Sequence, residues 1–195
     1  MKIPTVRRPK GFTLVELLVV IAIIAVLASA GFAAGNAAIQ KARKTTALAT
    51  ATSIETAVNN FYNEYGSMPD NGTTDTTLNT KNDTTLLNVL LGLEDAGNTV
   101  LNTRAIKFLS VKEGKANKNG LIYSSNGSSV DGLFDPWGGA YNVILDLDYD
   151  ERVKPQPSAG GATQLNGRRV AVWTNGADGV NGGGKLADDV KTWGN

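Results

Sequence analysis

The sequence predicts an α+β fold in which one long N-terminal α-helix packs on a small antiparallel β-sheet, with the N-terminal half of the helix crossing a membrane. Two observations support this prediction. Residues 17–40 contain no charged side chain, and a helix of that length rises about 36 Å, enough to span the hydrocarbon core of a bilayer. The rest of the chain is polar and rich in Thr, Asn and Gly, as expected for a domain in water.

A short basic segment precedes the apolar run. It ends at Gly11 and holds four basic residues: Lys2, Arg7, Arg8 and Lys10. Positive charge on this side of a spanning helix predicts a cytoplasmic N-terminus and a translocated C-terminal part. An ordinary single-pass anchor leaves Glu16, at the start of the run, unexplained. A twin-arginine export signal would carry an apolar pair after its arginines, and a conventional signal peptide would be cut after its apolar core.

The stretch KGFTLVELLVVIAIIAVLA, from Lys10 to Ala28, resembles the class III signal of type IV pilins and pseudopilins. The resemblance rests on a basic residue, Gly11, Phe12 and a glutamate at the fifth position after the cut. It implies that a prepilin peptidase cleaves between Gly11 and Phe12 and methylates the new amine of Phe12. It also implies a type IV pilin fold, in a subunit that is first held in the bacterial inner membrane with its C-terminal domain in the periplasm.

The same resemblance implies assembly into a helical homo-oligomeric filament, together with other pseudopilins or pilins and an inner-membrane assembly platform. Glu16 fits such a role physically. A carboxylate within a bilayer costs about 3 kcal/mol unless it finds a partner, and Glu16 lies one helical turn from Phe12. We therefore expect Glu16 to pair with the Phe12 amine of a neighbouring subunit and to set the axial step. The alternative is a helix-end glutamate that reaches the lipid headgroups.

The helix is expected to continue beyond the membrane as far as Tyr65. Apolar residues recur there every three or four positions, which gives an amphipathic stripe, and Gly66 and Pro69 end the pattern. The members of the stripe are Leu48, Ala51, Ile54, Val58, Phe61 and Tyr65. The predicted organisation is therefore a leader over residues 1–11, a transmembrane or filament-core helix over 12–36, and a periplasmic α+β domain over 37–195.

The soluble domain shows short elements. Residues 70–85 are rich in Thr, Asn and Asp and predict a surface loop. Residues 85–93 predict a short helix with Leu86, Leu87, Leu90 and Leu91 inward, and Ile106, Phe108 and Leu109 a brief buried segment. Strands are expected over residues 121–124, 141–149 and 169–174. Because tight turns separate the last two, the sheet should be antiparallel.

The strand predicted over residues 141–149 carries alternating aspartates that suggest a calcium-binding EF-hand. The pattern fails, because Arg152 follows where ligands should continue, the sixth position lacks glycine and the twelfth is Pro157. Alternation places Ile144, Asp146, Asp148 and Asp150 on the face away from the helix. The three acids are therefore interpreted as the solvent face of the strand, paired with Arg168 or Arg169.

The composition narrows the possible chemistry. The chain has no cysteine and no histidine. It therefore has no disulfide or thiolate nucleophile, no imidazole base and no Ser-His-Asp triad. We expect a structural protein rather than an enzyme. Basic patches with interleaved aromatics are also missing, so no nucleic-acid partner is predicted.

The C-terminal third carries a second resemblance. The sequences DPWG at residues 135–138, TNGADG at 174–179 and DDVKTW at 188–193 resemble the end of the major pseudopilin of type II secretion systems. The resemblance implies a calcium-binding loop over residues 174–193. Carboxylates of Asp178, Asp188 and Asp189 suit a hard cation such as Ca²⁺. By resemblance, backbone carbonyls of Asn175, Val180 and Leu186 would add ligands. The alternative is an acidic tail that holds no ion.

The functional expectation is a structural subunit of a type II secretion pseudopilus, which assembles from the inner membrane and helps to export folded proteins. The alternative is a major type IV pilin for adhesion, motility or DNA uptake. Many such pilins close the C-terminal region with a disulfide, which a chain without cysteine cannot form.

Overall fold

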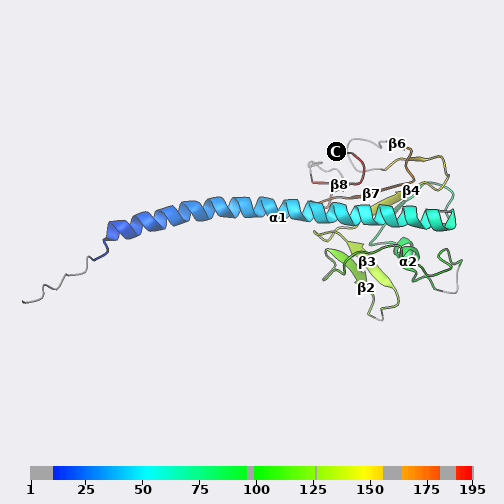
Figure 1. Ribbon diagram of the computed structural model, residues 1–195, viewed down its shortest axis with the longest axis horizontal. Coiled ribbons are helices and arrows are strands. Elements are labelled where there is room, and N and C mark those ends of the chain that lie inside the picture. Colours follow the sequence, from blue (N-terminus) through cyan, green and yellow to red (C-terminus); the bar gives the residue numbers. More distant parts are fainter. Residues whose placement is uncertain (1–10, 96–98, 126, 156–163, 181–187, 195) are drawn as a thin grey trace, which may run out of the picture. The chain divides into compact units, whose positions relative to one another are not determined.

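The computed structural model describes residues 11–95, 99–125, 127–155, 164–180 and 188–194 (Figure 1). The chain divides into two compact units, Met1–Lys41 and Ala42–Asn195. Helix α1 (Leu14–Tyr65) begins in the first unit and ends in the second. The predicted α+β class is confirmed, because this helix is followed by one short helix and by small antiparallel sheets.

Helix α1 is 52 residues long and ends where the sequence predicts. Gly66 has a φ of +70°, and its N–H donates to the carbonyl oxygen of Tyr62 at 2.8 Å. Such a left-handed residue suits glycine because it has no Cβ. Pro69 follows and cannot extend the helix.

The last turns of α1 bury the predicted apolar stripe, with one correction. Ala51, Ile54, Val58 and Phe61 are fully buried. Leu48 was expected among them, but it is 44 % exposed, and the neighbouring residue Ala47 is buried instead. Ala47 lies one helical turn before Ala51 and continues the buried stripe, whereas Leu48, about 100° further round the helix, points outward.

Helix α2 (Thr85–Leu91) matches the predicted short helix. It buries all four leucines that were expected to face inward, and Val89 as well. Gly92 caps its end with a φ of 70°. In the segment that follows, Leu109 is buried as predicted, whereas Phe108 is partly buried and packs edge-on against Phe61, with ring centroids 5.4 Å apart.

Within the described residues, the strands form one four-stranded sheet and two pairs, all antiparallel as predicted. The larger sheet has the order β1-β4-β7-β8. Its strands are β1 (Thr77–Asn79), β4 (Asn142–Leu145), β7 (Val170–Thr174) and β8 (Val190–Lys191). The pairs are β2 (Gly120–Tyr123) with β3 (Val130–Phe134), and β5 (Arg152–Val153) with β6 (Leu165–Asn166).

Two hydrophobic clusters lie on opposite faces of the larger sheet. Val143 and Leu145 of β4 join Ile54 and Phe61 of α1 in the main core. Ile144, between them, belongs to a second cluster with Trp173, Val153, Ala171 and Trp193. Figure 1 shows β4, β7 and β8 on one side of the C-terminal half of α1, and α2, β2 and β3 on the other. Both faces of β4 are therefore buried.

The strand predicted over residues 141–149 is shorter than expected. β4 ends at Leu145, and Ile144 and Asp146, assigned to a solvent face, are 4 % and 1 % exposed. Asp146 is buried because its carboxylate accepts the backbone N–H groups of Asp150 and Glu151, at 3.1 and 3.0 Å. This carboxylate therefore closes the turn after the strand instead of facing water.

The predicted arginine partners are also wrong. Arg168 pairs with Glu55 of α1, and Arg169 pairs with Glu151, each at 3.1 Å. Of the three aspartates, Asp150 forms an ion pair, with Arg152 at 3.8 Å.

Candidate functional site

The N-terminus of α1 forms a reciprocal cap around Glu16. The N–H and the hydroxyl of Thr13 both donate to Glu16 Oε2 at 2.8 Å, and the N–H of Glu16 donates to Thr13 Oγ1 at 3.2 Å. This is a capping box, in which two otherwise unpaired helix-end donors are satisfied. The negative charge also lies at the positive end of the helix dipole. Thr13 is a residue that the sequence analysis missed, although the spacing Thr-x-x-Glu would have indicated it.

The predicted cleavage junction lies just before this cap. Gly11 and Phe12 precede the first helical residue, and both are exposed. Phe12 is 71 % exposed. The basic leader over residues 1–10 lies outside the described part of the chain. The structure therefore places an accessible Gly11–Phe12 bond next to a helix start that already holds Glu16.

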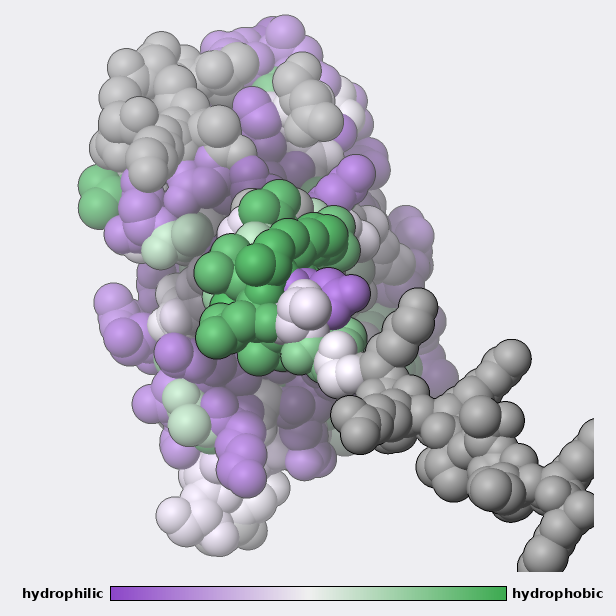
Figure 2. All heavy atoms as spheres, turned by 90° about the vertical axis from the view of Figure 1, so that its left-hand side faces the viewer, coloured by the Kyte–Doolittle hydropathy of each residue, from purple (hydrophilic) through white to green (hydrophobic). Residues whose placement is uncertain are grey.

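The first unit exposes an apolar helix surface. Large hydrophobic side chains are exposed along it from Phe12 to Ile39. Figure 2 shows hydrophobic side chains gathered in one green area. The exposed large hydrophobic residues of this segment are Phe12, Leu14, Val15, Leu17, Leu18, Val19, Val20, Ile21, Ile23, Ile24, Val26, Leu27, Phe32 and Ile39. Helix α1 is long and apolar enough to cross a membrane. Such a surface is stable only in lipid or against other apolar surfaces.

The second site is the predicted calcium loop, whose two arms leave the edge of the larger sheet together. Thr174 at the end of β7 pairs with Val190 at the start of β8. Asn175 follows the first and Asp189 precedes the second, so the pairing brings both beside each other. Among the predicted ligands, Asn175, Asp178, Val180, Asp188 and Asp189 are described, and Leu186 lies outside the described residues.

Asp188 shapes the first arm of this loop. Its Oδ2 accepts the N–H groups of Ala177 and Asp178, both at 3.0 Å. Gly176 has a φ of +66°, and a Cβ at this position would lie 2.2 Å from the carbonyl oxygen of Asp188. The close approach of the two arms therefore requires glycine here. Asp178 in turn accepts the N–H of Val180 at 2.9 Å.

Three oxygen atoms in this loop are buried without a hydrogen-bond donor in the described part of the chain. They are Oδ1 of Asn175, Oδ1 of Asp188 and Oδ1 of Asp189. Buried polar atoms are normally paired, because an unpaired one costs about 1–3 kcal/mol. Oxygen donors of this type suit Ca²⁺, which is bound in proteins by carboxylate, amide and carbonyl oxygens. The residues therefore fit a calcium ion.

The acids of the loop repel one another. Burial raises the pKa of the Asp189 carboxyl, and the nearby carboxylates of Asp188 and Asp178 raise it further. The ammonium groups of Lys191 and Lys44 act in the opposite direction. In the described part of the chain, ligand oxygens of Asp178, Asp188 and Asp189 do not all lie within 4.8 Å of one another. Val180 is 53 % exposed at the edge of the loop.

The DPWG motif adjoins the same sheet edge through Asp135, which is fully buried. Its Oδ1 accepts the N–H groups of Trp137, Gly138 and Gly139 at 2.8–2.9 Å. Its Oδ2 accepts the hydroxyl of Thr174. One carboxylate thus builds the turn between β3 and β4 and also holds the last residue of β7.

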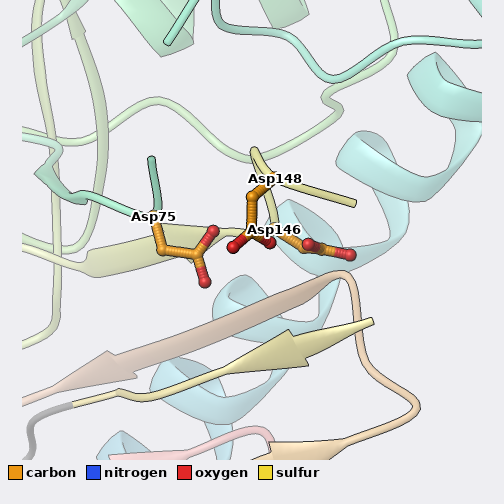
Figure 3. A group of neighbouring side chains, drawn as sticks. All are labelled: Asp75, Asp146 and Asp148. Carbon is orange, nitrogen blue, oxygen red and sulfur yellow. The ribbon is translucent and has the colours of Figure 1, made fainter. Parts of the chain in front are cut away.

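A third group of acids gathers after β4 (Figure 3). Oxygen atoms of Asp75, Asp146 and Asp148 lie within 4.8 Å of one another. Asp75 comes from the loop before β1 and accepts the N–H of Leu147 at 2.9 Å. Burial raises the pKa of Asp75 and that of Asp146, and repulsion from neighbouring carboxylates adds to both shifts. Asp75 was not predicted from the sequence, because 72 positions separate it from Leu147, which lies between the other two acids.

Comparison with known proteins adds one finding. A family model described as the prokaryotic N-terminal methylation motif matches residues 6–32. Curated proteins and solved structures gave no match. The matched segment includes the Gly11–Phe12 junction, the Thr13–Glu16 cap and much of the exposed apolar helix, and it is typical of structural subunits rather than of enzymes.

The motif is followed by the elements that the resemblance predicted, namely a long helix and antiparallel sheets packed on its second half. The chain therefore carries the N-terminal methylation motif of type IV pilin-like proteins, on an α+β chain with the arrangement of the type IV pilin fold.

Proposed function

We propose that this chain is the main structural subunit of a type II secretion pseudopilus. After prepilin peptidase cleaves the Gly11–Phe12 bond and methylates the amine of Phe12, helix α1 holds the subunit in the inner membrane. It then moves into a helical filament that helps to export folded proteins. The matched N-terminal motif supports the filament role. The secretion role rests on the C-terminal loop with its three unpaired buried oxygens.

In this proposal the exposed apolar surface of α1 has two successive environments. In the monomer it faces lipid, and in the filament it packs against the same segment of neighbouring subunits. Glu16 pairs with the Phe12 amine of a neighbour, in surroundings where the attraction is stronger than in water. Thr13 satisfies the same carboxylate within the subunit, so Glu16 is not left without donors before assembly.

The cap and the charge of Glu16 are separable by substitution. Glu16→Gln keeps an oxygen that accepts the Thr13 donors, because glutamine also serves in capping boxes, but it removes the charge. Glu16→Ala removes both, and Thr13→Ala removes part of the cap alone. If pairing with the amine drives assembly, both Glu16 variants insert into membranes and yield no filaments, while Thr13→Ala assembles. Filaments from Glu16→Gln at the normal level would exclude the charge mechanism.

The calcium ion, when bound, supplies positive charge that neutralises the acids of the C-terminal loop and holds the two arms together. Asp178, Asp188 and Asp189 would provide carboxylates, and Asn175 its side-chain oxygen. Val180 and Leu186 are proposed by resemblance to provide carbonyl oxygens. Because ion binding stabilises only the folded state, calcium at about 100 times its dissociation constant should add about 2.7 kcal/mol.

Thermal unfolding of the full chain in detergent micelles tests this site. Calcium should raise the melting temperature relative to chelator, and magnesium should not replace it. Asp189→Asn should raise the melting temperature in chelator, because it removes repulsion, and should abolish the gain from calcium. Asp148→Asn, in the separate acidic group, is the matched control and should keep that gain. An equal melting temperature with calcium and with chelator for the wild type would exclude a structural calcium ion.

A deletion strain separates the two filament functions. Loss of exported proteins from the medium, with surface pili and twitching motility unchanged, would support the secretion pseudopilus. Loss of surface pili with secretion unchanged would instead establish the alternative, a major type IV pilin.

A further inference from the structure

We propose that Asp135 and Thr174 are positioning residues for the C-terminal calcium loop: their hydrogen bond fixes the point from which both arms of the loop start. This inference rests on the calcium site of the proposed function and deepens it. Neither residue is a ligand in that proposal, and both are fully buried.

Thr174 lies where the two arms of the loop leave the sheet side by side. Its register partner in β8 is Val190, and the candidate ligands Asn175 and Asp189 are the residues next to this pair. A shift of Thr174 along or away from the sheet would therefore displace an oxygen donor on each arm. β8 itself is only two residues long. Its pairing with β7 alone therefore holds the start of the second arm only weakly.

The other side of Thr174 lacks a strand partner. The register between β4 and β7 runs from Leu145 with Val170 to Asn142 with Trp173, and stops there. Thr174 thus extends one residue beyond the ladder. In place of a backbone partner it has the hydroxyl bond to Asp135 Oδ2.

Asp135 is a rigid point of attachment. Its other carboxylate oxygen accepts three backbone N–H groups of the turn that follows it. Its own N–H donates to the carbonyl oxygen of Gly139 at 2.9 Å, and its carbonyl oxygen accepts the N–H of Asn119 at 2.7 Å. The carboxylate therefore cannot follow a displaced strand end without breaking this turn, and it holds Thr174 in one place.

Calcium affinity is the measurement that separates positioning from general stability. Partners that orient the ligands of a metal typically change its affinity 10–100-fold when they are removed. Because Thr174 acts one residue away from the ligands, we expect Thr174→Val to weaken calcium binding by about 10-fold. Thr174→Ser keeps the hydroxyl and should restore binding to within about twofold of the wild type.

Thr80 provides the matched control. It is also a buried threonine, its hydroxyl donates to the carbonyl oxygen of Leu133 at 2.7 Å, and it accepts the N–H of Tyr141 at 2.9 Å. Thr80→Val should lower the melting temperature in chelator at least as much as Thr174→Val does, since it removes two buried hydrogen bonds and Thr174→Val removes one. It should leave calcium affinity unchanged, because Thr80 adjoins neither arm of the loop.

The experiment is calcium titration by calorimetry on the full chain in detergent micelles, with melting temperatures in chelator measured in parallel. Weakened binding in Thr174→Val alone, with rescue by Thr174→Ser, supports the proposal. Wild-type affinity in Thr174→Val, or equal weakening in Thr80→Val, overturns it while leaving the calcium site standing. No binding by the wild type removes the calcium site and this inference together.

If Thr174→Val does not fold, Asp135→Asn tests whether the hydrogen bond between Asp135 and Thr174 affects calcium affinity. Its remaining oxygen still accepts the three turn N–H groups, and its amide nitrogen can donate to Thr174. The bond then loses the charge of the carboxylate and becomes weaker, so calcium binding should weaken by about threefold or more. Unchanged affinity in this variant would overturn the proposal as well.

Discussion

The rings of Trp173 and Trp193 meet edge to face, with centroids 5.8 Å apart and ring planes at 82°. Trp173 lies in β7, and Trp193 lies near the C-terminus beyond β8. Together with Ile144, Ala171 and Val153 they form the cluster on the face of the sheet opposite α1. This contact joins the end of the chain to the sheet, directly after the candidate calcium loop.

Trp193→Ala should therefore destabilise the soluble domain strongly. Trp193 is 7 % exposed, and removing a buried tryptophan side chain costs about 3–5 kcal/mol. Trp193→Phe keeps an aromatic edge against Trp173 and should lose less than half of that. Chemical denaturation in chelator measures both. A loss below about 1 kcal/mol for Trp193→Ala would show that the second cluster contributes little to the fold.

The sequence predicted the long elements well, because their patterns are local. The helix end at Gly66, the inward leucines of α2 and the antiparallel pairing of β4 with β7 all match. Five strands were missed. β5, β6 and β8 are two residues each, too short for an alternating pattern to appear. β1 is three residues and lies within the predicted loop over residues 70–85, and β3 has five residues, of which Gly132 interrupts the pattern.

The errors at Ile144 and Asp146 have a common cause. Alternation predicts which residues share a face, but not whether the second face is covered. Here Trp173 and Trp193 cover it, and Ile144 is buried. Asp146 is buried by a turn whose N–H donors come from the residues after it. The burial of Ile144 and that of Asp146 each depend on a segment outside the strand that packs against it. The periodicity of the strand carries no information on such a segment.

The candidate site can be read from the sequence where a motif fixes the spacing, as the Thr-x-x-Glu pattern does at Thr13 and Glu16. It was not predictable where two distant segments meet. Asp135 and Thr174 are 39 positions apart, and nothing in the spacing of DPWG indicates that its aspartate binds the end of β7.

Asp148→Asn should stabilise the domain at neutral pH. Burial and the neighbouring acids raise the pKa of Asp75 and of Asp146. A raised native pKa means that the native state binds more protons than the unfolded state, so stability falls as pH rises from the ordinary aspartate pKa through the raised one. Removing the Asp148 charge relieves part of this repulsion, by roughly 0.2–1 kcal/mol.

The gain from Asp148→Asn should be present at pH 7 and should vanish below about pH 4, where the carboxyl groups are protonated. Melting temperatures between pH 3 and pH 8, measured in chelator, give the comparison. Asp131→Asn, an exposed aspartate on β3 outside this group, should show no such gain. A gain independent of pH would mean that repulsion is not its cause.

The ion pair between Arg168 and Glu55 should contribute more than the pair between Arg169 and Glu151. The Arg168 and Glu55 side chains are 34 % and 23 % exposed, against 40 % and 61 % for the other pair. Less solvent around a pair means weaker screening. Double-mutant cycles with Arg→Met and Glu→Gln should give a coupling of about 0.5–1 kcal/mol for the first pair and less for the second. Equal couplings would contradict this.

Gly176 and Gly179 form a matched pair that tests the close approach of the two arms of the C-terminal loop. Both have a left-handed backbone, with φ values of +66° and +68°. A Cβ at Gly179 would meet nothing within 4 Å, whereas at Gly176 it would strike the backbone of Asp188. Alanine at either position has the same backbone strain, about 1–2 kcal/mol, but only Gly176→Ala also forces the arms apart.

Gly176→Ala should therefore cost about 1–3 kcal/mol more than Gly179→Ala in chelator. It should also remove the stabilisation by calcium, because Asp188 can no longer approach Asn175 and Asp178, while Gly179→Ala should retain it. Denaturation curves of the full chain in detergent, with calcium and with chelator, measure both effects. If the two alanine variants lose equal stability and both still respond to calcium, the arms do not need the spacing that the structure gives them.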